Sequence, residues 1–110
     1  MSEPTNEKAL VNRIVEAVTS AYPEAWWLKT HGGAYQRAGV PDLLVSIEGR
    51  LFAFEVKHLK PGETIEHAKR RVTLRQRVEI ERIDASGATA RIVMSVEQVL
   101  DTIDQQLKGK

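Results

Sequence analysis

Two short apolar segments joined by a tight turn constrain this chain more than any other feature. Residues 42–47 and 51–58 each have the length of a strand, and Glu48-Gly49-Arg50 between them is a turn sequence. Apolar residues fill most positions of both segments, rather than every second position, which is typical of strands covered on both faces. We therefore predict an antiparallel hairpin with helices packed on both of its faces.

Sequence signals on either side of the hairpin predict the other elements. Apolar residues at helical spacing predict a helix that begins near Thr5 or Asn6 and ends at Pro23. Further along the chain we expect a strand at 26–30, a helix from the N-cap Thr73 to Ser86-Gly87, a strand at 88–94, and a helix opened by a capping box of Ser95 and Gln98. Residues 64–72 fit either a short basic helix or a mobile loop. The order α-β-β-β-α-β-α describes a small mixed α/β sheet flanked by helices, in one domain over residues 1–110.

Composition excludes several classes of protein. The absence of cysteine rules out a disulfide scaffold, a cysteine-ligated zinc site and a cysteine nucleophile. The chain begins without a secretory signal, and no apolar run reaches the roughly 18 residues that a membrane span requires. We therefore expect a cytoplasmic protein with no membrane contact.

The distribution of charge is more informative than its total. The net charge of +1 alone argues against a strongly basic nucleic-acid binder. Residues 57–82, however, hold eight Lys and Arg against four Glu, a net charge of +4 in one block. Such a block is either a solvated helix face or part of a binding surface, depending on what lies beside it.

Two carboxylates and an ammonium group converge at one end of the predicted hairpin. Asp42 begins the first strand, while Glu55 and Lys57 project from one face near the end of the second. Two carboxylates about 4 Å apart repel by about 4 kcal/mol at an effective dielectric constant near 20. A shared proton, Lys57 or a divalent cation must offset this repulsion. Oxygen ligands, including the Val56 carbonyl, favour Mg²⁺ or Mn²⁺ over zinc.

These residues resemble the signature of the PD-(D/E)xK nuclease superfamily. Pro41-Asp42 is followed, after twelve residues, by Glu55-Val56-Lys57. A wider set of segments resembles the VRR-NUC (virus-type replication-repair nuclease) domain within that superfamily: residues 39–44, 54–57 and 73–76, then Gly87 and the strand that ends in Ser95-Val96-Glu97. Residues 59–72 depart from the family pattern because they are longer and more basic than is usual.

The resemblance implies a restriction-endonuclease-like fold and a metal-dependent endonuclease. Such an enzyme cuts branched or structured DNA of the Holliday-junction or flap type, commonly as a homodimer, and is typical of bacteria and phages. Asp42, Glu55 and the Val56 carbonyl would then bind Mg²⁺ or Mn²⁺, and Lys57 would activate the attacking water. The alternative is a non-catalytic DNA-binding accessory module that keeps the nuclease fold.

Two further residues match supporting positions of the family. Gln76 corresponds to a glutamine close to the metal and substrate, although a buried structural hydrogen bond would also explain it. Of the glutamates in the first predicted helix, Glu7 is the better candidate for the family's helical glutamate, which assists the metal or the water. Its other explanation is an acid that complements the helix dipole in the first turn. Candidate DNA contacts are basic residues near the site: Lys29, His31, Arg37, Lys60, Lys69, Arg70 and Arg71.

Overall fold

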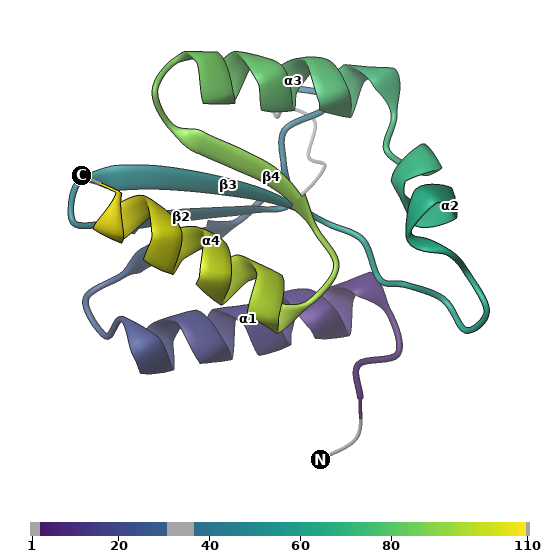
Figure 1. Ribbon diagram of the computed structural model, residues 1–110, viewed down its shortest axis with the longest axis horizontal. Coiled ribbons are helices and arrows are strands. Elements are labelled where there is room, and N and C mark those ends of the chain that lie inside the picture. The colour runs from purple at the N-terminus through teal and green to yellow at the C-terminus, as the bar shows by residue number, and fades with distance from the viewer. Residues whose placement is uncertain (1–2, 31–36, 110) are drawn as a thin grey trace.

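The hairpin forms the two central strands of a four-stranded sheet (Figure 1). The computed structural model describes residues 3–30 and 37–109. Strands β2 (Leu43–Ile47) and β3 (Arg50–Val56) pair antiparallel, with Leu43 opposite Phe54. Glu48 and Gly49 between them have φ angles of +51° and +78°. Positive φ at both central residues is what a type I′ turn requires, so the predicted hairpin is confirmed.

The outer strands make the sheet mixed. Strand β1 (Trp26–Lys29) pairs antiparallel with β2, and β4 (Thr89–Val93) pairs parallel with β3. The order β1-β2-β3-β4 therefore leaves β1 at one edge, where the side chains of Trp26, Trp27 and Leu28 are exposed.

Helices cover the two faces of the sheet unequally. Helices α1 (Glu7–Ala21) and α4 (Val96–Lys108) pack together on one face, and α3 (Leu74–Ala85) lies on the other (Figure 1). The main core lies on the α1 and α4 side and is made of apolar residues from both helices and all strands except β1: Leu10, Ile14, Val18, Leu43, Val45, Ile47, Phe52, Phe54, Val56, Val93, Val99 and Ile103. In the part of the chain that the structure describes, no helix has the length and apolar character needed to cross a membrane.

Burial on both faces is confirmed for β3 but only in part for β2. All residues of β3 from Phe52 to Val56 are buried. In β2 only alternate residues are buried, and Leu44 and Ser46 keep partial exposure. The reason is that α3 packs over β3 and β4 and leaves that face of β2 less covered.

The segment between β3 and α3 contains a helix, one of the two alternatives expected for it. Helix α2 (Ile65–Arg70) begins where the Thr64 hydroxyl accepts a hydrogen bond from the His67 amide at 3.1 Å. Ala68 is fully buried and anchors this short helix to the fold. The observed order is therefore α-β-β-β-α-α-β-α.

The capping box expected at the start of α4 is only half formed. The Ser95 hydroxyl accepts from the Gln98 amide at 3.1 Å, as expected. The Gln98 side chain, however, accepts from the amide of Met94 at 2.7 Å rather than from that of Ser95. Helix α3 does have a complete capping box, formed by Thr73 and Gln76.

Gly39 fixes the segment that leads into Asp42, and its substitution provides a test. Its φ is +86°, and a Cβ at this position would lie 2.7 Å from the Arg75 carbonyl oxygen. We expect Gly39→Ala to lower the free energy of unfolding by about 1–3 kcal/mol or more. The added Cβ would both strain the backbone at positive φ and collide with the Arg75 carbonyl. Gly49→Ala is the matched control, since Gly49 has φ +78° but open space around it. Urea unfolding followed by circular dichroism measures both variants, and equal losses would contradict the role of the Arg75 contact.

Candidate active site

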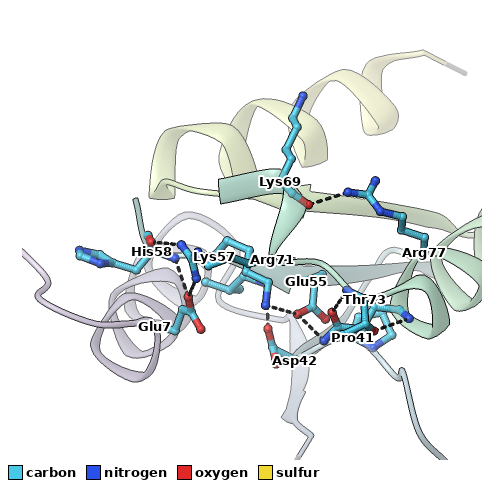
Figure 2. A network of polar contacts seen from close by, with 12 residues as sticks. Glu7, Pro41, Asp42, Glu55, Lys57, His58, Lys69, Arg71, Thr73 and Arg77 are labelled. Atoms are coloured by element: carbon cyan, nitrogen blue, oxygen red, sulfur yellow. Dashed lines mark hydrogen bonds and ion pairs between the residues drawn. The ribbon is translucent and has the colours of Figure 1, made fainter. Parts of the chain in front are cut away.

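The register of the hairpin brings Asp42 and Glu55 to the same place on the sheet. Leu43 lies opposite Phe54, so one residue further along the two strands Asp42 faces Glu55. The Asp42 carboxylate accepts a hydrogen bond from the Val56 amide at 2.8 Å. Lys57 follows, and its Nζ lies 3.6 Å from Glu55 Oε2 (Figure 2). The structure thus brings together Asp42, Glu55 and Lys57 at the end of β3.

Helix α3 adds Gln76 to this group. Gln76 Nε2 donates a hydrogen bond to Glu55 Oε2 at 3.1 Å. Gln76 Oε1 accepts from the Thr73 amide at 2.8 Å, which closes the capping box of α3. The helix cap therefore fixes the same amide group that orients Glu55. Gln76 thus joins the cap of α3 to Glu55, and its role close to a metal and substrate stays a prediction.

Glu55 is a buried carboxyl group with one oxygen left bare. The residue is 1% exposed, and its Oε1 has no hydrogen-bond partner among the described residues. Burial first, and then the charge of Asp42, raise the pKa of Glu55 to about 8, although Lys57 acts in the opposite direction. Near neutral pH the metal-free carboxyl group is therefore mostly protonated. Bare buried acceptors are rare in proteins and mark places where a water or an ion binds.

The available oxygen atoms fit a hard divalent cation. Across residues 3–30 and 37–109, no group of three or more His, Cys, Asp or Glu side chains is arranged to hold a metal. The site offers instead the two carboxylates of Asp42 and Glu55. It also offers the Val56 carbonyl, which points to the same side of the strand as the Val56 amide that meets Asp42. One or two carboxylates with remaining positions for water and phosphate are the usual ligands of Mg²⁺.

Glu7 reaches the end of β3 but binds a different partner. Its Oε2 accepts hydrogen bonds from Arg71 Nη1 at 2.8 Å and from the His58 amide at 3.2 Å (Figure 2). Burial acts to raise the pKa of Glu7, yet the bonds from Arg71 and His58 hold that pKa below its usual value. Glu7 is therefore a carboxylate engaged in an ion pair beside the peptide that follows Lys57.

Two of the arginines expected to contact DNA make ion pairs within the chain. Arg71 is bound by both Glu7 and Glu63, with its Nη2 and Glu63 Oε1 3.0 Å apart. Arg37 Nε lies 2.8 Å from Oε2 of Glu79, an acid that is itself buried. The guanidinium of Arg71 is largely enclosed, whereas the side chain of Arg37 is 67% exposed.

The other expected DNA contacts lie on two different parts of the fold. Lys29 lines a cavity of about 380 Å³ that adjoins Asp42, between α1 and β1. Lys60, Lys69 and Arg70 are exposed on the segment that contains α2. His31 lies outside the described residues.

Three residues near the site were missed at the level of sequence. Lys8 and Asn12 line the same cavity as Lys29, and the Lys29 ammonium donates a hydrogen bond to Asn12 Oδ1. No local pattern could reveal them, because they meet Lys29 only when α1 packs beside β1. Glu79 did carry a signal, since it lies three residues after Gln76 on the inward face of α3.

Comparison with known proteins identifies the fold. No family model and no curated protein matches the chain. A solved structure described as a "VRR_NUC domain protein" matches with a TM-score of 0.68 and 19% sequence identity, over 98% of this chain and 92% of the other. A second, described as a "VRR_NUC domain", matches with a TM-score of 0.56 and 26% identity, over 84% of this chain and 92% of the other. The chain has the fold of a VRR-NUC domain. The small mixed sheet flanked by helices is thereby confirmed and is consistent with a PD-(D/E)xK-like core.

The raised pKa of Glu55 predicts how stability depends on pH. The unfolded chain releases this proton near pH 4.5 and the folded chain only near pH 8, so stability falls as pH rises between these values. We expect Glu55→Gln to remove this loss. At about 1.4 kcal/mol per pKa unit, the variant should be more stable than the wild type by a few kcal/mol at about pH 9, and the difference should shrink toward pH 5. Urea unfolding at both pH values measures the effect, and a difference independent of pH would contradict it.

Proposed function

We propose that this chain is a metal-dependent endonuclease that hydrolyses phosphodiester bonds in DNA. The observation that carries the proposal is the Glu55 carboxyl group, which is buried with one bare oxygen beside Asp42 and Lys57. A buried acid with one oxygen left without a partner lowers stability, and strongly shifted carboxyl groups of this kind are frequent at functional sites. The VRR-NUC names of the structural neighbours agree with nuclease chemistry.

Each residue of the site has a separate role in the proposed hydrolysis. Asp42, Glu55 and the Val56 carbonyl would hold Mg²⁺ or Mn²⁺, which lowers the pKa of bound water and neutralises charge on the phosphate. The Lys57 ammonium would orient the attacking water and stabilise the negative charge that develops on the phosphoryl oxygens. Gln76 keeps Glu55 oriented through the bond to its Oε2. The expected products are a 5′-phosphate and a 3′-hydroxyl.

The positions of the basic residues favour branched or structured DNA, of the Holliday-junction or flap type, as the substrate. Lys29 lies in the cavity beside Asp42, while Lys60, Lys69 and Arg70 lie on the segment around α2. Positive charge therefore lies beside Asp42 and, separately, on the segment that follows β3, on a chain whose net charge is only +1. Two DNA arms that diverge from one branch point would meet both surfaces. A homodimer would supply two such sites for paired cuts, and light scattering tests that state.

Cleavage assays test the proposed activity directly. We expect Lys57→Ala and Asp42→Asn each to slow cleavage of four-way junctions or flaps in Mg²⁺ or Mn²⁺ by about 100-fold or more, because each loses a group that acts on the reacting atoms. Lys108→Ala is the control, since Lys108 is exposed at the end of α4 and pairs with Asp104 on the same helix. If both site variants cut as fast as the wild type, the assignment is wrong. A wild type that binds these DNAs without cutting them would point to the accessory module.

Metal binding should depend on pH because the ion displaces the proton of Glu55. Below pH 8 we expect Mn²⁺ affinity to rise about tenfold per pH unit, and above that value to level off. Calorimetry in buffers of different ionisation heat should show the released proton. Asp42→Asn and Glu55→Gln should each abolish the tight site. Affinity independent of pH, or retained in both variants, would contradict this assignment of the ligands.

A further inference from the structure

Arg71 links the start of α1, 64 residues earlier in the chain, to two nearby positions in the segment between β3 and α3. Its guanidinium makes four hydrogen bonds, to acceptors on α1, on the loop before α2, and on the backbone after β3. The side chain is 23% exposed, so these contacts are largely enclosed. Figure 2 shows those that Arg71 makes with Glu7 and His58. A guanidinium holds several acceptors in fixed directions, which the single ammonium of lysine cannot do.

The contacts of Arg71 converge on the peptide that follows Lys57. Arg71 Nη2 donates to the His58 carbonyl at 2.7 Å. Arg71 Nη1 holds Glu7, and Glu7 accepts from the His58 amide at 3.2 Å. On the other side, the Lys57 amide donates to the Val93 carbonyl at 2.9 Å. The backbone on both sides of Lys57 is therefore fixed.

Arg71 also pairs with a carboxylate whose charge attracts Lys57. Glu7 lies close enough to Lys57 for their charges to attract. With Arg71 in place, Glu7 is paired, and Lys57 keeps its position 3.6 Å from Glu55 Oε2. Without Arg71, Glu7 would compete with Glu55 for the Lys57 ammonium.

From these contacts we propose that Arg71 is a positioning residue for Lys57, acting through Glu7 and the His58 peptide. The proposal rests on the proposed nuclease function only where activity is the readout. It gives the long 59–72 segment a purpose, because this segment supplies both Arg71 and Glu63, the acid that holds it.

Kinetics of Arg71→Gln test the proposal. We expect kcat to fall roughly 10- to 100-fold, as is typical when a partner of a catalytic group is lost, with KM for DNA unchanged. In a Lys57→Ala background the same change should cost nothing further, because Arg71 acts through Lys57. Arg91→Gln is the matched control. Arg91 forms an ion pair with Asp84, with 2.8 Å between Nη1 and Oδ1, and this pair is not part of the site. The substitution should therefore leave both kcat and KM unchanged.

Two measurements on the protein itself complete the test. In metal-free protein, Arg71→Gln should shift the NMR signals of the Lys57 side chain and speed hydrogen exchange of the His58 amide, and Arg91→Gln should do neither.

Glu7→Gln should slow cleavage while leaving Mn²⁺ affinity unchanged. If Arg71→Gln does not fold, Arg71→Lys and Glu63→Gln weaken the same network and take its place.

Several outcomes would overturn the proposal. A higher KM and a shallower salt dependence at unchanged kcat would make Arg71 a phosphate contact. Full additivity with Lys57→Ala would make its role general stability. Weaker Mn²⁺ binding by Glu7→Gln would make Glu7 a ligand. If the wild type cuts no DNA, the nuclease proposal fails by itself, and the Lys57 and His58 signals still decide whether Arg71 positions Lys57.

Discussion

Burial of the Glu55 carboxyl group at the end of β3 is the constraint on which the rest of the site depends. A buried ionised group is costly unless it is paired and hydrogen-bonded. Lys57 and Gln76 provide pairing for one oxygen, and the other stays bare. Burial of the apolar residues of the hairpin around Glu55 offsets the loss of stability that this buried carboxyl group causes. The protein thus keeps a high-energy carboxyl group that either a proton or a cation can stabilise.

The parts of the fold that could be predicted are those with local sequence signals. The hairpin follows from its apolar runs and from a turn whose glycine accepts positive φ, and its register alone brings Asp42 to Glu55. Helix α2 gave no clear signal, because a helix of six residues depends on its Thr64 cap and on burial of Ala68. The partial exposure of β2 was also beyond prediction, since it depends on where α3 lies.

Within the site, contacts between segments far apart in the sequence could not be predicted. Gln76 could be placed because it lies on the inward face of its own helix. The partner of Glu7 could not, because Arg71 follows it by 64 residues and a charge pair at that separation leaves no periodic pattern. For the same reason the sequence left the block of positive charge open between a solvated helix face and a binding surface, and the pairing of Arg71 with two carboxylates of the same chain could not be foreseen.

The exposed edge strand has a consequence for optical experiments. Both tryptophans of the chain, Trp26 and Trp27, lie in β1, and none is in the core. Intrinsic fluorescence therefore reports on the rim of the sheet, where a strand of four residues is held by a single neighbour. Fraying of this rim would change emission while the ellipticity of the helices stays constant. Emission and ellipticity together can thus separate local opening from global unfolding in one titration.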